Sequence, residues 1–272
     1  MDLNAVTEVV RPRTRAELPA WRPGDAVLAG GTWLFSEPQP GAARLVDLDA
    51  LGWPAAEVAA DGLRVGATCT MRALERLALP PAWAAAPLLL QCCRALSASF
   101  KVASAATVGG NLCLALPAAP MAPLAAALDG QCLVWTPGGG ERLVPAERFA
   151  LGERRTALLP GEVLRWVDLP AAALRRRAAF RRASLVPYGR SATLLIGTLD
   201  PGDGAFALTV AASVAAPAVL RFPALPDADG LAAAIGQAIP GDAWWRDAHG
   251  SPAWRRHMTN LLAEEIRQEL AA

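Results

Sequence analysis

The sequence predicts an α+β fold in two domains, and three observations support this class. From Ala26 onward, short apolar runs of strand character, such as "AVLAG" and "LRVGA", alternate with helical patterns. The texture changes at Pro170, where an Arg-rich segment begins, and the chain closes on an amphipathic helical pattern. With 272 residues the chain is long enough for one large domain or two smaller ones, and we expect two.

The first part of the chain contains one helix and one hairpin that are easy to place. In "TMRALERLAL", Thr70 can cap a helix in which Met71, Leu74 and Leu77 share a face, and the two prolines that follow end it. The run "LVWTPGGGERLVP" predicts two strands around a Pro-Gly-rich turn. Antiparallel neighbouring strands are therefore expected in this part.

The second part is expected to be a small α+β unit. We interpret "PAAALRRRAAFRR" as a connector. The runs "ATLLIGTLD" and "FALTVAAS" then predict a hairpin, which a further strand follows. In the last segment Ser251 can act as N-cap and Pro252 as first helical residue, with apolar residues every four positions from Trp254 to Leu270. The domain boundary is placed near Pro170.

Charge and composition exclude several classes of function. The 26 Lys and Arg residues nearly balance the 25 Asp and Glu residues, so there is no basic surplus for nucleic acid or anionic lipid. The first residues, "MDLNAVTEVVRPRTR", lack the pattern of a secretory signal, and we expect a cytoplasmic protein. The stretch from Val102 to Leu128 has no charge, but its glycines and prolines would break a membrane helix, so we expect a buried turn and a short helix around "MAPLAAAL".

Cysteine and histidine usage argues against metal and triad chemistry. The five cysteines are scattered and form no CxxC pair, which argues against a disulfide framework and a four-cysteine metal site. Buried reduced thiols are expected instead. Both histidines, His249 and His257, lie near the C-terminus, so a His-centred site in the first 240 residues is excluded.

Two glycine pairs follow strand-like or apolar runs and are candidate anion-binding loops. In "VLAGGTWL", Gly30 and Gly31 permit positive φ and close approach of backbone N–H groups to an anion, and Thr32 can add a hydroxyl. In "ATVGGNLC", Gly109 and Gly110 have the same design, with Thr107 before them and Asn111 after them. Each pair alone is more often an ordinary turn, and neither has GxGxxG or P-loop spacing, but two such loops together could bind a pyrophosphate.

The ordered motifs "AGGTxL", "ATVGGNL" and "ERFALGERRTALLPGEVLRWVDLP" resemble the FAD-binding medium subunit of the molybdenum hydroxylases, the xanthine dehydrogenase and carbon monoxide dehydrogenase group. Further segments, "VVRPRTRAEL", "AAFRRASLVPYGRSATLLI" and "HGSPAWRRHMTNLLAEE", extend the resemblance over nearly the whole chain. The resemblance implies a two-part FAD-binding domain of the vanillyl-alcohol-oxidase type, residues 1–170 with subdomains of about 1–55 and 56–170. A C-terminal α+β domain, residues 171–272, follows it, with the flavin between the parts.

The resemblance also implies which residues contact the cofactor. The FAD pyrophosphate and adjoining groups would be bound by two segments and two single residues: Val27, Leu28, Ala29, Gly30, Gly31, Thr32, Trp33, Leu34, Thr107, Val108, Gly109, Gly110, Asn111, Leu164 and Arg181. Leu164 could equally be an inward core residue, and Arg181 a surface cation. Tyr188 could face the flavin or simply pack. No catalytic acid, base or metal ligand is expected in this chain.

The activity implied by the resemblance is electron transfer within a complex. A large subunit with the molybdenum cofactor would oxidise the substrate, a small iron-sulfur subunit would relay single electrons, and FAD would pass them in pairs to an acceptor. The scattered cysteines agree with clusters carried by a partner. A dimer of heterotrimers is the expected assembly. The sequence specifies neither the substrate nor the final acceptor.

The sequence departs from the family pattern at polar positions. Trp33 stands where relatives have an acid, Ser104 ends the segment aligned with "IRN", and Leu116 and Pro120 replace the serine and aspartate of "SPxxD". Backbone donors would survive these changes. A second hypothesis is therefore kept, a scaffold subunit with little or no flavin. A stand-alone flavoenzyme is disfavoured, because no acid-base pair lies near the loops.

Overall fold

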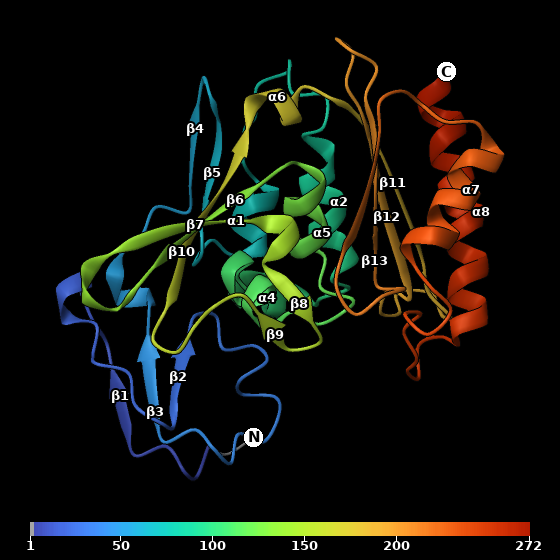
Figure 1. Cartoon of the computed structure of the whole chain (residues 1–272). Coiled ribbons are helices and arrows are strands. Elements are labelled where there is room, and N and C mark those ends of the chain that lie inside the picture. The colour runs from blue at the N-terminus through green and yellow to red at the C-terminus, as the bar shows by residue number, and fades with distance from the viewer. Residues whose placement is uncertain (1–2) are drawn as a thin grey trace.

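The computed structural model describes residues 3–272 and contains three sheets of three or more strands and one two-stranded sheet (Figure 1). We use the names N-terminal unit for residues 3–55, central unit for 56–170 and C-terminal unit for 171–272. The mixture of sheets and helices agrees with the α+β class expected from the sequence. Among the described residues, no helix is long and apolar enough to cross a membrane.

The N-terminal unit is a small parallel sheet. Its strands are β1 (Glu8–Val10), β2 (Asp25–Leu28) and β3 (Arg44–Asp47), in the order β1-β3-β2. β3 lies in the middle and pairs in parallel with both neighbours. The connection from β2 to β3 carries the first glycine pair, so this sheet positions that loop.

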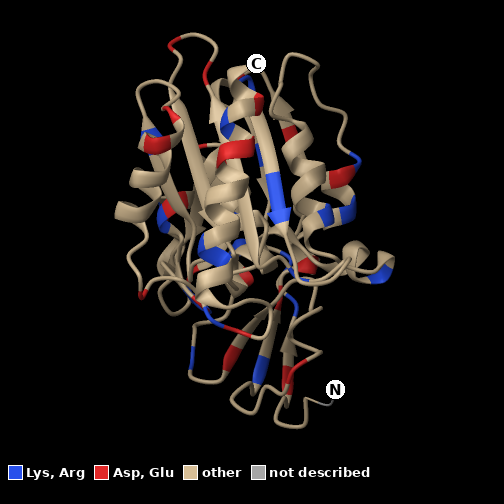
Figure 2. Cartoon of the chain, turned by 90° about the vertical axis from the view of Figure 1, so that its right-hand side faces the viewer, with Lys and Arg blue, Asp and Glu red and all other residues tan. Residues whose placement is uncertain are grey.

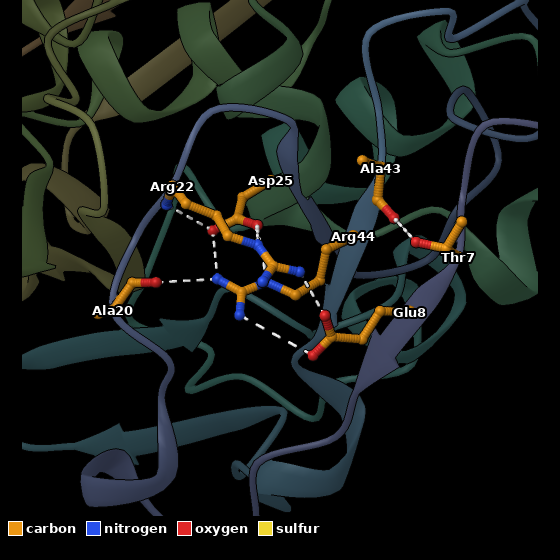
Figure 3. A network of polar contacts seen from close by, with 7 residues as sticks. All are labelled: Thr7, Glu8, Ala20, Arg22, Asp25, Ala43 and Arg44. Carbon is orange, nitrogen blue, oxygen red and sulfur yellow. Dashed lines mark hydrogen bonds and ion pairs between the residues drawn. The ribbon is translucent and has the colours of Figure 1, made fainter.

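A buried ion pair joins the strands of this small sheet (Figure 3). The Arg44 guanidinium donates to both carboxylate oxygens of Asp25, at 2.7 and 2.6 Å, and to the carbonyl of Ala20 at 2.8 Å. Arg22 pairs with Glu8 of β1. The hydrogen bonds from Arg44 lower the pKa of Asp25, so this carboxylate stays charged. The network holds the beginning of β2, and hence the loop after it, against β3.

The central unit is an antiparallel sheet covered on one face by helices (Figure 1). The strands, in spatial order, are β4 (Ala56–Ala59), β5 (Gly62–Gly66), β10 (Val163–Pro170), β6 (Gln131–Trp135) and β7 (Glu141–Pro145). The pairing of β6 with β7 confirms the hairpin predicted from "LVWTPGGGERLVP". A two-stranded sheet, β8 (Ala150–Gly152) and β9 (Arg155–Thr156), follows β7.

Five short helices lie between β5 and β6 in the chain. They are α1 (Met71–Glu75), α2 (Pro87–Ala95), α3 (Phe100–Ala105), α4 (Val108–Leu114) and α5 (Met121–Ala127). The Thr70 hydroxyl accepts a hydrogen bond from Ala73 N at 3.1 Å, which confirms the predicted cap of α1. The prediction of a turn at "ATVGGNLC" was wrong about the secondary structure of the glycine pair. Thr107 caps a helix there, and α4 contains both glycines.

The C-terminal unit is a four-stranded antiparallel sheet with two helices on one face (Figure 1). A short helix α6 (Ala171–Leu174) leads into β11 (Arg177–Ala183), β12 (Thr193–Leu199), β13 (Phe206–Ala211) and β14 (Ala218–Phe222), followed by α7 (Ala228–Ala238) and α8 (Pro252–Ala271). The hairpin and the terminal helix were predicted, and Ser251 caps α8 as expected. The interpretation of the Arg-rich segment as a connector was wrong: it forms α6 and the edge strand β11, because its alternating side chains face two different cores.

The central and C-terminal units share a hydrophobic core. Leu194 and Ile196 of β12 belong to the same buried cluster as the central helices. Across the junction, Ala212 N donates to the carbonyl of Pro117 at 3.0 Å, and Arg176 pairs with Asp129 at 2.7 Å. The shared core and these contacts make the junction a packed, fixed boundary.

Acidic and basic residues are interspersed over the side of the molecule that the C-terminal helices cover (Figure 2).

Arg255 of α8 is the largest fully buried side chain among the described residues and fixes one end of the C-terminal unit. Its guanidinium donates to the carbonyls of Ala192, Ala212 and Gly250 and to the carboxylate of Asp247. A buried cation is tolerated only when such acceptors surround it. This arginine therefore connects α8 to the start of β12 and the end of β13.

Replacing Arg255 by leucine should destabilise the chain by about 3 kcal/mol or more, because Asp247 and three carbonyls lose their donor inside the protein. Urea denaturation followed by circular dichroism measures this. The matched control is Arg256→Leu on the exposed side of the same helix, for which we expect a change within about 0.5 kcal/mol. Equal effects of the two substitutions would contradict the assignment.

The cysteines behave as buried apolar residues. Cys69, Cys92, Cys93 and Cys132 are buried, and every cysteine is a free thiol. Burial raises the pKa of Cys69 to about 11 and that of Cys93 and Cys132 to about 12. The expectation of buried reduced thiols is confirmed for these four residues.

We therefore expect the folded chain to react very slowly with a disulfide reagent such as DTNB at about pH 8, since the thiolate is the reacting form and these groups stay protonated and shielded. All five cysteines should react once the chain is unfolded in guanidinium. Rapid reaction of several thiols in the native protein would show that this core opens readily.

Candidate functional site

The first glycine loop follows β2, and its own backbone N–H groups are unpaired. Leu28 O accepts from Leu48 N at 2.9 Å, which closes the end of the sheet. Beyond it, the N–H groups of the residues from Gly30 to Leu34 have no acceptor anywhere in residues 3–272. All of these residues are half-buried. A row of unpaired N–H groups in a turn is a concave binding site for an anion.

Both glycines of this loop are required by its packing. A Cβ at Gly30 would lie 1.8 Å from the carbonyl oxygen of Ala105, so any other residue would push the loop away from the end of α3. Gly31 has φ +67° and lies under the Phe35 ring, where a Cβ would be 2.4 Å from a ring carbon. The free donors are therefore held against the central helices by glycine contacts.

The backbone N–H groups of the second glycine pair have hydrogen-bond acceptors inside the chain. Val108 N donates to Cys69 O and Gly109 N to Ala67 O, both at 2.8 Å. Gly110 N donates to the Thr107 hydroxyl at 3.0 Å, as in a capped helix. The backbone donors of Val108, Gly109 and Gly110 thus have acceptors inside the chain, whereas those of the first loop do not.

Close packing explains Gly109, the first glycine of the second pair. A Cβ at Gly109 would be 2.6 Å from the Cβ of Ala67, whereas at Gly110 only the Thr107 hydroxyl would lie within 4 Å. The Asn111 side chain accepts a hydrogen bond from Met121 N at 3.0 Å and so ties α4 to α5. Of the residues from Thr107 to Asn111, only Gly110 and Asn111 are partly open to a ligand.

The electrostatics of the two segments favour an anion. No charged residue lies between Asp25 and Glu37, and none lies between Lys101 and Asp129. Neither segment therefore brings a carboxylate beside the free N–H groups. Because an anion would meet donors and no nearby negative charge from these segments, the first loop can hold a phosphate group without a basic side chain.

Trp33, which the sequence placed in the loop in place of an acid, lies among these donors. Its indole nitrogen is buried and makes no hydrogen bond within residues 3–272. Its carbonyl accepts from the hydroxyl of Ser36 at 3.0 Å, which fixes the turn that follows. The loop therefore contains one unpaired side-chain donor in addition to its backbone donors.

A cavity of about 190 Å³ lies where the central and C-terminal units meet. One wall is formed by the segment after α4, and the other by residues around the start of β12 and the loop before α8. Its lining is mixed, with the apolar residues Leu116 and Ala118 beside the polar and charged residues Ser191, Arg190, Glu153 and Asp247. Ser191 is 2% exposed and its hydroxyl has no partner within residues 3–272. The sequence did not indicate this cavity, because its walls come from segments far apart in the chain.

The remaining residues suggested by the resemblance lie elsewhere. Leu164 is buried in the core of the central unit, as in the alternative interpretation. Arg181 pairs with Glu265 and Glu269 of α8 at 2.8 and 2.6 Å, on the face of β11 that looks away from the central unit. Tyr188 is 93% exposed. The structure does not bring Arg181 together with the glycine loops.

Arg182, the next residue along β11, was missed by the sequence analysis and faces the junction. It donates to the carbonyl of Gly189 at 2.6 Å and to the Ser97 hydroxyl at 3.3 Å. No carboxylate in residues 3–272 pairs with it, and burial lowers its pKa. Alternation along a strand places Arg181 and Arg182 on opposite faces, a signal that could be used only once this segment was known to be a strand.

Metal chemistry has no visible site in the part of the chain that the structure describes. In residues 3–272 no three His, Cys, Asp or Glu side chains lie close enough together to bind a metal ion. The site residues described above are backbone donors, glycines, a tryptophan and a mixed cavity. Such a set can bind an anionic, partly apolar organic ligand.

Comparisons with known proteins bear on the family and the fold of this chain. A sequence model of the family described as FAD binding domain in molybdopterin dehydrogenase matches residues 5–172. No curated protein sequence matches the chain.

Solved structures share the fold over nearly the whole chain. Quinoline 2-oxidoreductase from Pseudomonas putida 86 is 23% identical with a TM-score of 0.79, covering 99% of this chain and 98% of that one. Carbon monoxide dehydrogenase from Oligotropha carboxidovorans is 21% identical with a TM-score of 0.83 and 96% coverage of both chains. The corresponding values for carbon monoxide dehydrogenase from Hydrogenophaga pseudoflava are 20%, 0.77 and 96%.

The family match covers more than half of the sequence and includes both glycine segments. The first of these segments has the row of unpaired N–H groups and, at Gly30, the closest contact that a glycine Cβ would make with the backbone. The chain therefore belongs to the family of FAD-binding domains found in molybdopterin dehydrogenases.

Proposed function

We propose that this chain binds one FAD and is the electron-transfer subunit of a molybdenum-containing hydroxylase. The observation that carries the proposal is the row of unpaired N–H groups from Gly30 to Leu34. Such groups can donate hydrogen bonds to the oxygens of a pyrophosphate. Family membership supports FAD as the ligand. The charge of the loop also supports the fit, because every residue between Asp25 and Glu37 is uncharged.

The chain's own residues would hold the cofactor in the following way. The N–H groups of the first loop would donate to the phosphate oxygens, and Gly31 would let the backbone approach them closely. Gly110, the more open glycine of the second pair, would leave room beside the helix start. When bound, FAD supplies the two-electron redox chemistry, while the protein supplies its position and surroundings.

The ring system of FAD would lie toward the cavity at the junction of the central and C-terminal units. The first loop contacts Ala105, just before α4, and the cavity begins at Leu116, just after it. The seven residues of α4 span about 10 Å at about 1.5 Å per residue. This helix would thus run alongside the sugar-alcohol chain that links the pyrophosphate to the ring.

The electrons would come from partner subunits. The molybdenum cofactor and the iron-sulfur clusters would belong to a large and a small partner subunit, as the resemblance to the molybdenum hydroxylases implies. The structural relatives are named as a quinoline 2-oxidoreductase and carbon monoxide dehydrogenases, which fits a complex of this class. We propose a dimer of heterotrimers in the cytoplasm, with electrons leaving the flavin for an external acceptor.

A scaffold with little or no flavin is the second candidate. It is favoured by the apolar residues Leu116 and Pro120 at positions where the family pattern has polar side chains. Each lost hydrogen bond would cost about 0.5 to 1.5 kcal/mol, or up to about tenfold in affinity. The free donors of the first loop remain, which is why we place FAD binding first.

The purified chain, or its complex, should carry or take up about one equivalent of FAD, measured by flavin absorbance after gel filtration. Gly110→Glu should weaken binding about tenfold or more, because a carboxylate beside the phosphates repels them. Gly41→Glu is the matched control: it adds the same charge at an exposed glycine with nothing within 4 Å of its Cβ, and should bind FAD normally. A wild-type chain that takes up no FAD would favour the scaffold.

Ala118→Phe should disturb binding of the ring end of FAD and leave binding of its diphosphate end unchanged. The larger side chain would fill part of the cavity at the junction and weaken FAD binding, while ADP, which lacks the ring system, should bind as it does to the wild type. Calorimetric titration with both ligands measures this, with thermal unfolding as a check on the fold. Unchanged FAD affinity would mean that the ring lies elsewhere.

A further inference from the structure

Arg165 of β10 is a buried cation for which the described chain supplies no partner. The residue is 9% exposed, and its guanidinium makes no hydrogen bond or ion pair within residues 3–272. The other buried charged residues of this part of the chain, Arg44, Glu162 and Arg255, each bond a group of opposite charge. Because a charge removed from water without a partner is costly, Arg165 needs an acceptor from outside the chain.

Three tryptophan rings lie beside the guanidinium. Its carbon is 4.3 Å from the ring centre of Trp53, 4.6 Å from that of Trp166 and 5.7 Å from that of Trp135. Cation–π contacts of this kind attract the charge to the ring faces. They supply no hydrogen-bond acceptor in the plane of the guanidinium, where its five N–H groups point. The rings therefore hold the guanidinium in place without using its donors.

A β-bulge presents Arg165 on the outer face of the central sheet, the face opposite its helices (Figure 1). β10 pairs with β6 at Leu164 and again at Trp166, and Arg165 is the extra residue between them. Leu164 and Val167 pack into the core with the helices. Alternation along the strand places Trp166 on the outer face, and Arg165 lies over its ring.

The guanidinium nitrogens of Arg165 reach solvent, although most of the residue does not. In residues 3–272 four buried side-chain polar atoms are both unpaired and shielded from solvent, and none of them belongs to Arg165. Since the nitrogens of Arg165 are also unpaired, their absence from this set means that solvent touches them. A ligand can therefore approach the donor edge of the guanidinium from outside.

The surroundings of Arg165 favour a carboxylate over a phosphate. A carboxylate matches the guanidinium with two parallel hydrogen bonds and carries a single charge. Burial lowers the pKa of Arg165, and the nearby Glu57 opposes this shift. Glu57 would repel a doubly charged phosphate more strongly than a carboxylate. The half-buried rings of Trp53 and Trp166 would cover an apolar group attached to the carboxylate.

We propose that Arg165 is the centre of a carboxylate-binding site on the outer face of the central sheet. Its ligand is a monocarboxylate with an apolar body, which is either a free acid or a carboxyl group on the surface of a partner protein. The site uses no residue of the glycine loops or of the cavity at the junction, so it does not depend on the binding of FAD.

Titration of the full chain with cyclohexanecarboxylate tests the site, followed by tryptophan fluorescence and calorimetry. We expect saturable binding that changes the emission, because the ligand would lie against the tryptophan rings. Cyclohexanecarboxamide has nearly the same shape without the charge and should not bind. Inorganic phosphate should bind at least about tenfold more weakly than the carboxylate, because of Glu57.

Substitutions assign the binding to Arg165. Arg165→Gln removes the charge and should weaken binding about tenfold or more. Arg165→Lys keeps the charge without the planar donors and should weaken binding severalfold, which provides a second test if the glutamine variant does not fold. Arg148→Gln, at an exposed arginine, is the matched control and should bind as the wild type does. Thermal unfolding of each variant checks the fold.

The same titration on the complex with the partner subunits distinguishes the two sources of the carboxylate. A free acid should bind to the complex as it binds to the isolated chain. If a partner supplies the carboxylate, the complex should not respond to the probe, and Arg165→Gln should weaken assembly measured by gel filtration. The inference is overturned if the isolated chain binds no carboxylate and Arg165→Gln assembles normally. Equal binding of the amide or of phosphate would also overturn it.

Discussion

The close contact between Gly30 and the carbonyl of Ala105 is the constraint on which the candidate site depends. No side chain fits between the first loop and the end of α3, since a Cβ at Gly30 would lie 1.8 Å from that oxygen. The contact joins the small parallel sheet to the helices of the central unit. In this position the N–H groups from Gly30 to Leu34 meet no acceptor within the described chain. An anion is the partner that such an arrangement suits best.

The two glycine pairs differ in structure, because their backbone N–H groups make different hydrogen bonds. The first pair leaves its donors free, whereas the second uses its donors to begin α4 and to pack on Ala67. α4 then leads from the loop to the cavity at the junction, whose walls come from the central and C-terminal units. The shared core and the hydrogen bond from Ala212 N to the Pro117 carbonyl hold that junction together.

Much of the fold could be predicted because its signals are local. The Thr70 cap, the β6–β7 hairpin and the Ser251-Pro252 start of α8 depend on neighbouring residues, and each was correct. The Arg-rich segment was misinterpreted, because its role as strand β11 depends on pairing with β12. The sequence indicated both glycine loops, but which of them keeps its donors free, and where the cavity lies, depend on contacts between distant segments that no local pattern contains. The domain division at about residue 170 and the individual cofactor contacts stay predictions.

The difference between the two loops, free backbone donors in the first and paired donors in the second, determines where a cofactor can bind. Amide hydrogen exchange, measured residue by residue with and without FAD, detects this difference directly. We expect fast exchange at Gly30 to Leu34 that FAD slows, and slow exchange at Val108 to Gly110 that FAD leaves unchanged. Protection of the first loop without ligand, or no effect of FAD on it, would show that its N–H groups are not the cofactor's donors.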